Sequence, residues 1–197
     1  GEEIANFAYN FSTRRNAADT AYTDSVAKTT SVYYYNNLRA GLEGVTSETA
    51  MNMSETYKVT AIGDINKLAK TLTNTPNIQS ETYYKKGKGD ETADFSKNYQ
   101  TGTLTIKSTS VFFYSPVTGQ TGLQRALDAD VDSAMERSLS YKDAKTVNDT
   151  TDFYDGTAAN VITDKIALTS ETHYYGSVKG EEIANFAYNF STRRNAA

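Results

Sequence analysis

The sequence predicts a β-rich α+β protein made of two related domains of about 90 residues in tandem, which together form a period of 179 residues. Three observations support this prediction. The 197-residue chain is rich in Thr and Tyr, with 28 and 15 residues, and both types favour strands. Several segments alternate apolar and polar residues, which is the period of a strand. Long stretches of the sequence also occur twice.

The first expected element is a strand near the start of the chain. Apolar residues alternate with small or polar ones at Ala5, Phe7, Tyr9 and Phe11. The same stretch also has apolar residues at the i, i+3, i+4 and i+7 spacing of a helix. The related segment Ala93–Tyr99 keeps the alternation better than the helical spacing, so we prefer the strand.

The other strands follow from runs of β-branched and aromatic residues. We expect them at Val26–Tyr35, Ile78–Lys85, Thr103–Tyr114 and Ile166–Tyr175. Ser115-Pro116 ends the third of these, because proline cannot donate to a sheet ladder. The stretch 85–90, rich in glycine and lysine, predicts a turn at the junction of the domains.

One amphipathic helix per domain completes the predicted fold. Apolar residues from Leu123 to Leu139 recur at helical spacing, which predicts a helix over about 121–140. The first domain has a weaker version of this pattern from Leu42 to Tyr57. Each domain would run strand, strand, helix, irregular stretch, strand, either as an α+β fold or as a sandwich with one helical crossover.

The two ends of the chain are identical in sequence. Residues 1–18 and residues 180–197 both read GEEIANFAYNFSTRRNAA, at an offset of 179. Three explanations compete. The chain is a window on a long tandem array, or an end segment was copied so that a subunit fills a gap in itself or in a neighbour, or the duplication has no function.

A weaker repeat divides the period into two halves. Four blocks occur in the same order in each half, namely 28–35 with 107–114, 50–58 with 134–142, 80–84 with 170–175, and 88–99 with 179–190. The third pair needs one inserted residue. The spacing between blocks drifts, as expected where insertions fall in loops. We therefore place domain A at 1–88, domain B at 89–179, and the start of the next copy of A at 180–197.

Composition argues against several classes of function. The chain has no Cys, one His, a net charge of −4 and a pI near 5.1. We therefore expect no cofactor, no Cys- or His-ligated metal and no nucleic-acid partner. No apolar run approaches the length of a transmembrane segment, and no segment has a signal-peptide pattern. No catalytic constellation is recognisable, so we expect no enzymatic activity.

The individual candidate sites have structural explanations. His173 has no catalytic partner motif around it and corresponds to Tyr83 or Tyr84 in the first half. Three acids at 128, 130 and 132 have the spacing that opens a calcium loop, but they lack its later Gly and Glu, and we expect them on the solvated face of the predicted helix. Calcium binding by the acidic stretch 149–156, glycosylation and an isopeptide cross-link all stay open.

The repetition predicts a structural function. We expect a segment of an extracellular or cell-surface fibre, stalk or surface-layer protein, with a spacer or adhesive role. Its partners would be its own neighbouring repeats or subunits, and a surface receptor or glycan. The alternative is a filament-forming subunit that polymerises by strand exchange through 1–18 and 180–197. The expected contact residues are Ala5, Phe7, Tyr9, Phe11, Ala184, Phe186, Tyr188 and Phe190.

Overall fold

The computed structural model describes residues 3–58, 62 and 77–192. The described residues form one antiparallel sheet of ten strands. The strands are β1 (Phe7–Ser12), β2 (Val26–Tyr35), β3 (Leu38–Arg39), β4 (Met51–Lys58), β5 (Ile78–Lys85), β6 (Thr92–Tyr99), β7 (Ile106–Tyr114), β8 (Met135–Lys142), β9 (Leu168–Tyr175) and β10 (Ile183–Asn189). The prediction of a β-rich protein is confirmed.

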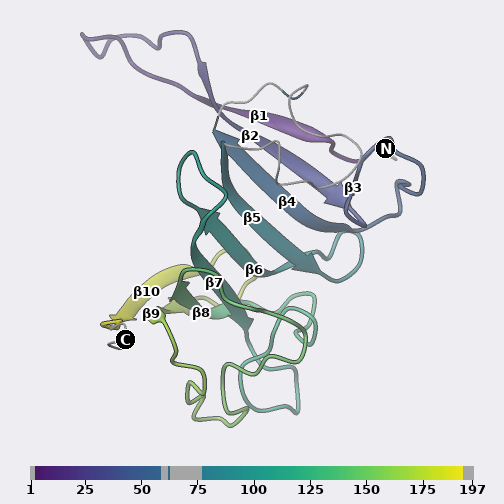
Figure 1. Cartoon of the computed structure of the whole chain (residues 1–197), viewed down its shortest axis with the longest axis vertical. Coiled ribbons are helices and arrows are strands. Elements are labelled where there is room, and N and C mark those ends of the chain that lie inside the picture. Colours follow the sequence, from purple (N-terminus) through teal and green to yellow (C-terminus); the bar gives the residue numbers. More distant parts are fainter. Residues whose placement is uncertain (1–2, 59–61, 63–76, 193–197) are drawn as a thin grey trace.

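The strands follow one another across the sheet in chain order. The order is β1-β2-β4-β5-β6-β7-β8-β9-β10, and the two-residue strand β3 pairs with β2 beside this path. The sheet twists from β1 at one end to β10 at the other, so the first and last strands lie at opposite ends of the sheet (Figure 1). Among the described residues, β1 and β10 each pair with one strand only, and they form the two edges of this sheet.

The strand predictions hold closely, because alternation and β-branched residues dominate these segments. β2 and β5 have the expected bounds, and the expected segments 103–114 and 166–175 contain β7 and β9. β1 also lies where the alternation places it. The β2–β3 hairpin turns at Asn36 and Asn37, whose positive φ angles of 52° and 64° are those of a type I′ turn, in which Asn is well tolerated.

The two expected helices are wrong. Residues 121–134 form turns and one isolated bridge, and the next residues belong to β8; the matching stretch from Leu42 forms turns that lead into β4. Two of the supposed core positions, Leu127 and Val131, are exposed. Short polar side chains bond to the local backbone instead: Asp130 N donates to Ser133 Oγ at 3.1 Å. Such bonds compete with helix formation.

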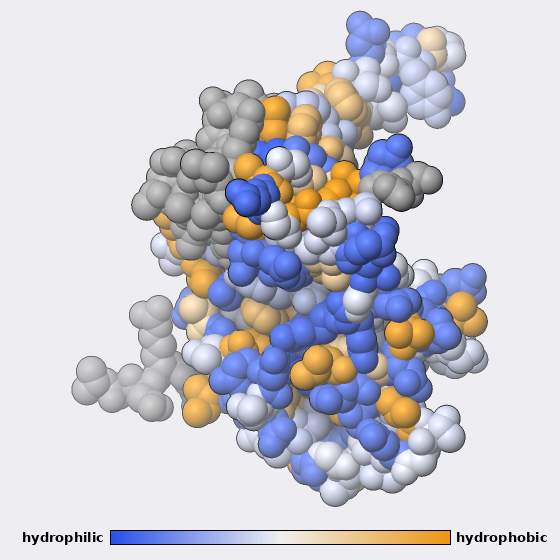
Figure 2. All heavy atoms as spheres, turned by 90° about the vertical axis from the view of Figure 1, so that its right-hand side faces the viewer, coloured by the Kyte–Doolittle hydropathy of each residue, from blue (hydrophilic) through white to orange (hydrophobic). Residues whose placement is uncertain are grey.

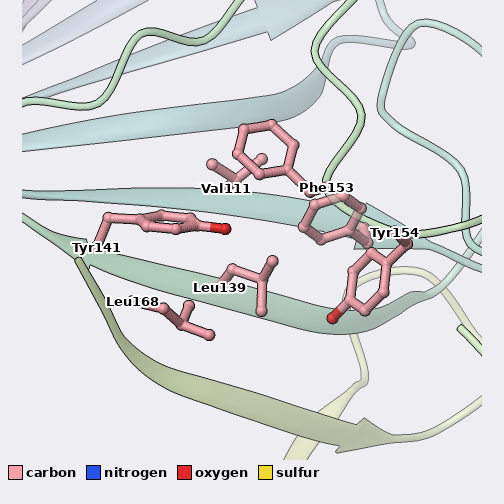
Figure 3. Close-up of a cluster of buried hydrophobic side chains, with 7 residues drawn as sticks. Val111, Leu139, Tyr141, Phe153, Tyr154 and Leu168 are labelled. Atoms are coloured by element: carbon pink, nitrogen blue, oxygen red, sulfur yellow. The ribbon is translucent and has the colours of Figure 1, made fainter. Parts of the chain in front are cut away.

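Most of the core lies on one face of the sheet, and a small third cluster of Tyr114, Ala126 and Ala129 packs against Phe112. In the second half, the loop between β8 and β9 places Phe153 and Tyr154 over Val111, Leu139 and neighbouring residues (Figure 3). Phe113 packs edge-on against both rings, with centroid distances of 5.9 and 4.8 Å. A second cluster, centred on Val32, Tyr34, Met53, Tyr57 and Ile78, fills the first half. Aromatic rings supply much of the apolar area in both clusters.

Much of the opposite face of the sheet is polar. A row of hydroxyl side chains crosses strands β4 to β9 on paired residues, namely Ser54, Thr82, Ser96, Ser110, Ser140 and Ser170. These residues alternate along their strands with core residues, as in an antiparallel sheet with one solvated face. The sheet therefore has one apolar face, which loops cover, and one hydroxyl-rich face.

The two halves of the sheet have the same strand registers. Val32 pairs with Glu55 between β2 and β4, and at the aligned positions Val111 pairs with Leu139 between β7 and β8. The boundary expected at 88/89 lies in the turn between β5 and β6, and these two strands pair with each other. One sheet thus runs through both halves, and two separate domains are not confirmed.

Candidate functional site

The contact residues expected from the sequence lie on or beside the two edge strands. β1 carries Phe7, Tyr9 and Phe11 and follows Ala5, while β10 carries Ala184, Phe186 and Tyr188 and precedes Phe190. Because these strands are opposite edges of the sheet, the structure does not bring the two sets together within one chain (Figure 1). All seven residues of β10 are exposed, so its free backbone edge is accessible to another strand.

β1 is fixed on β2 by side-chain contacts as well as by the backbone ladder. The Arg39 guanidinium donates through Nε to Asn6 Oδ1 at 2.9 Å. The Tyr35 hydroxyl donates to the carbonyl of Ala5 at 2.8 Å. The Asn10 amide donates to two hydroxyls of β2 at 3.0 and 2.9 Å. These bonds fix the register of β1.

β10 is fixed on β9 by a different set of contacts. The Phe186 ring stacks on His173, with centroids 4.3 Å apart and planes 20° apart. Tyr188 meets the same imidazole edge-on at 5.6 Å. Just before β10, the Glu182 carboxylate accepts a hydrogen bond from the Met135 backbone N at 2.8 Å. Stacking and a bond to the strand beyond β9 therefore fix this edge.

On the side that faces β5, the internal strand β6 makes contacts equivalent to those that β10 makes with β9. Phe95 stacks on Tyr83 with centroids 4.4 Å apart and planes 13° apart, which matches the pair Phe186 and His173. Glu91 accepts from the Met51 backbone N at 3.1 Å, as Glu182 does from Met135. The registers of the two strand pairs agree as well.

On the side that faces β7, β6 makes contacts equivalent to those of β1 with β2 and the residues that follow it. Asp94 forms a bidentate salt bridge with Arg125, with N to O distances of 2.8 and 2.7 Å, where Asn6 bonds to Arg39. The Tyr114 hydroxyl donates to the carbonyl of Ala93, as Tyr35 does to Ala5. β6 therefore combines a β10-like side and a β1-like side. The second edge of β10 pairs with no strand of the described residues.

Side-chain exposure follows the number of flanking strands. Tyr99, at the end of β6, is 6 % exposed, whereas Phe190 at the aligned position beyond β10 is 40 % exposed and Phe11 of β1 is 61 % exposed. These three positions come from related sequence, so burial by neighbouring strands accounts for the difference. The edge strands carry apolar side chains that an adjoining strand and its loops would cover.

His173 has a structural role in this arrangement. Thr82 and Thr172 hold the same register positions opposite Ser54 and Ser138. The prediction of an inserted residue in this block is therefore wrong, and His173 corresponds to Tyr83. Both rings stack on the phenylalanine of the next strand, as described above.

Buried carboxylates lie in the core and not in a cleft. In the first half, the hydroxyls of Tyr34 and Tyr57 both donate to Glu55 Oε2, the former at 2.6 Å. Burial, followed by the charge of Glu55, raises the pKa of both phenols far above the usual range. The carboxylate is thus held as an acceptor of two protonated phenols, which is a packing arrangement.

The second half uses a different acid. Glu171 accepts from Arg137 Nη1 at 2.9 Å and from the Tyr154 hydroxyl at 2.8 Å. Burial alone would raise the pKa of Glu171, but these two hydrogen bonds, together with the nearby His173 and Arg137 charges, outweigh it and hold the pKa below its usual value. Burial again raises the pKa of Tyr154, here beside Glu171.

The acids of the stretch 149–156 bond to different partners and do not converge on one site. Asp149 pairs with Lys85 at 2.6 Å, and the Asp155 carboxylate accepts from Thr157 and Val161 in its own loop. Within the part of the chain that the structure describes, no group of three or more His, Cys, Asp or Glu could hold a metal ion. Asp128, Asp130 and Asp132 lie in turns, so their expected place on a helical face is wrong.

A pair of equivalent grooves, which sequence analysis did not anticipate, lies at one end of the strands. Each measures about 350 Å³. One is lined by Tyr33, Tyr35, Met51, Lys88 and Glu91, among others, and the other by Phe112, Tyr114, Met135, Lys179 and Glu182 at the aligned positions. Each half of the sheet thus presents a groove lined by aromatic rings, one Lys and at least one Glu; Glu91 lines both grooves.

Two further contacts of the edge region also escaped the sequence analysis. Arg39 and Arg125 are aligned in space but lie outside every repeated block. Glu91 and Glu182 lie inside a block, and their recurrence as Glu3 in the first copy was a usable signal. An alignment of three copies, instead of two, would have identified this glutamate.

The face shown in Figure 2 mixes hydrophobic and hydrophilic residues. Over its lower part, single hydrophobic residues are scattered among hydrophilic ones, which is usual for a protein surface. None of the helices in the described residues is long and apolar enough to cross a membrane. No protein-family model, curated protein or solved structure matches the chain. The interpretation therefore rests on the edge strands.

Proposed function

We propose that this chain is a segment of a non-enzymatic structural protein made of tandem 179-residue repeats. Each period would add its strands to one continuous sheet. The protein would act as a spacer or adhesive element in an extracellular or cell-surface fibre, stalk or surface layer. Its first partners would be its own neighbouring repeats.

One observation carries the proposal. β10 belongs to the segment 180–197, which is identical to the segment 1–18 that contains β1. It lies on β9 with the register and stacking by which β6 lies on β5. A strand of the type that opens a period thus already continues the sheet of the period before it. Repetition of the sequence would repeat this step without a new kind of contact.

The dimensions favour a spacer. A period contributes eight strands to the main path of the sheet, and antiparallel strands lie about 4.8 Å apart. Each further period would therefore lengthen the sheet by about 40 Å along its hydrogen-bonding direction, before twist is considered. Such growth is linear in the number of repeats.

The polar core supports a structural role over a catalytic one. The acids with the most developed hydrogen-bond environments, Glu55 and Glu171, are nearly inaccessible and accept from phenols and a guanidinium. A catalytic acid or base must reach a substrate, whereas these two carboxylates are buried against side chains of the core.

The two equivalent grooves support the adhesive part of the proposal. Each combines aromatic rings with a Lys and a Glu, which suits a glycan or a peptide segment of a surface receptor. A weak contact repeated twice per period would gain strength from multivalency.

The proposal is tested on proteins of one, two and three periods. We expect the maximum dimension from small-angle X-ray scattering to rise by a constant increment of about 40 Å per period. In addition, the intact denatured mass of the protein from its natural source should be several times that of one period. A source mass near one period, or periods that scatter as independently tumbling beads, would overturn the proposal.

A further inference from the structure

In a tandem array, the seam between two periods would be the pairing of β10 with β2 of the following period. We infer that this seam can also form between separate chains, with β10 of one copy replacing β1 on β2 of another copy. The partner is a second copy of this chain. The inference rests on the proposed function, because it uses the same seam, but it adds an intermolecular route to assembly by strand donation.

The donated and the displaced segments have the same sequence. The segment that a neighbour would donate, 180–197, is identical to the segment that it would displace, 1–18. Every contact of β1 with β2 can therefore be remade. Asn185 would replace Asn6 at the Arg39 guanidinium, and Asn189 would replace Asn10 at the hydroxyls of β2. Within the described residues, neither Asn185 nor Asn189 has a side-chain hydrogen bond of its own.

The backbone N–H groups of β10 and β1 point in directions that suit this exchange. Tyr33 N donates to Asn6 O, and hydrogen-bonded positions alternate along an antiparallel pair, so Ala8 also directs its N–H toward β2. Phe190 N donates to Thr169 of β9. By the same alternation, Ala187 directs its N–H away from β9, toward the free edge. β10 can therefore stay on its own β9 while it pairs with a neighbour's β2.

β6 already has the two-sided pairing that a donated β10 would have. β6 lies between β5 and β7 with both sets of contacts satisfied. A donated β10 would lie between β9 of its own chain and β2 of the neighbour in the same registers. The apolar side chains that β10 exposes, including Phe186, Tyr188 and Phe190, would gain the neighbours that the equivalent residues of β6 have.

In the intact chain, β1 competes with the donor because it is tethered to its own β2. Tethering gives β1 an effective concentration in the millimolar range, so the wild-type chain should remain monomeric at micromolar concentration. Weakening β1 without changing β10 should shift the balance toward donation. The two copies of the segment can be altered independently, which provides matched variants.

The test uses the 197-residue chain and analytical ultracentrifugation. Ala8→Pro removes the N–H that β1 directs to β2 and leaves the donor intact, so we expect assemblies of several-fold the monomer mass at tens of micromolar. Ala187→Pro alters the donor and leaves β1 in place, so this variant should stay monomeric. The double variant should also stay monomeric. Adding the 18-residue peptide GEEIANFAYNFSTRRNAA should dissociate the Ala8→Pro assemblies, because it caps β2.

A second variant without proline keeps the test possible if the Ala8→Pro chain does not fold. Phe7→Ser/Tyr9→Ser weakens the packing of β1 through its side chains alone. This variant should bind the fluorescently labelled peptide, and the same peptide with Pro at its eighth position should bind at least tenfold more weakly. Folded, monomeric variants that bind no peptide would overturn the inference. If a two-period protein nevertheless forms one continuous sheet, the proposed function stands and intermolecular donation alone fails.

Discussion

β6 and β10 come from related sequence and begin the same structural unit, yet one is an internal strand and the other is an edge. None of the eight residues of β6 is exposed, whereas all seven residues of β10 are. The two strands make equivalent contacts with the preceding strand. They differ in the second side, where β6 has β7 and the Asp94–Arg125 salt bridge.

This difference shows which strand contacts contribute most to the stability of the sheet. A strand of this type needs both neighbours before its side chains are buried, since its aromatic residues point to a face that loops of the adjoining strands cover. The contacts with the preceding strand set register, and the contacts with the following strand provide most of the burial. Matched substitutions in β6 and β10 can separate the two contributions.

The largest contrast should come from proline. Ser96 occupies in β6 the position of Ala187 in β10 and of Ala8 in β1, so it directs its N–H to the following strand. Ser96→Pro should abolish folding, because central strands do not tolerate proline. Ala187→Pro should change the free energy of unfolding by less than about 0.5 kcal/mol. Urea denaturation followed by circular dichroism checks both, and equal damage would contradict the comparison.

The next contrast concerns the polar side chain near the start of each strand. The salt bridge between Asp94 and Arg125 is nearly inaccessible, with 2 % and 12 % side-chain exposure. Asp94→Ala leaves a buried guanidinium unpaired and should cost about 3–5 kcal/mol. Asn6→Ala removes one hydrogen bond to Arg39 and should cost about 1 kcal/mol, while Asn185→Ala should cost almost nothing. Chemical denaturation should reproduce this ranking, and any other order would contradict it.

Aromatic truncation should give a somewhat smaller contrast. Tyr99→Ala removes a buried ring and should cost about 3 kcal/mol. Phe190→Ala removes a ring at the aligned position that is largely exposed, and should cost less than about 1 kcal/mol. The measurement is the shift in thermal midpoint of each variant. Similar losses at the two positions would show that the β10 side chains are already buried in solution.

The smallest effect is a pH dependence on the strand that precedes β10. The pKa of Glu171 is held below its ordinary value by Tyr154 and Arg137, so this group binds fewer protons in the folded state. Its stabilising contribution is present above the unfolded pKa near 4.3 and is lost as the pH falls through the lower folded value. Glu171→Gln should lower the thermal midpoint at pH 7 and change it little near pH 3.

Glu181→Gln serves as the control for this pH dependence, because its side chain is exposed. This variant should follow the wild-type profile at both pH values. A Glu171→Gln profile that is parallel to wild type would mean that the hydrogen bonds to Glu171 contribute nothing to stability.

Much of this arrangement could be predicted from the sequence, and the part that could not has physical causes. Alternation and β-branched residues located β2, β5, β7 and β9, and the repeat located both edge strands. The expected helices failed because apolar residues of a strand and its preceding turns happened to fall at helical spacing. Spacing alone cannot distinguish a continuous helix from turns stabilised by bonds such as Asp130 to Ser133.

The paired arginines were hidden by loop length. Two residues separate Tyr35 from Leu38 in the first half, whereas nine residues separate Tyr114 from Gln124 in the second. Arg39 and Arg125 therefore occupy the same place on the sheet at different distances along the chain. Insertions in loops are well tolerated, so sequence blocks located the strands but not the side chains that follow such loops.

The central claim is that β10 is the first strand of a continuing sheet, and amide hydrogen exchange tests it most directly. In a protein of two periods in series, the N–H groups of Ala187 and Asn189 at the junction should exchange at least about a hundredfold more slowly than in the 197-residue chain. They should approach the rates of Ser96 and Asn98 in β6. Unchanged exchange at the junction would contradict the account.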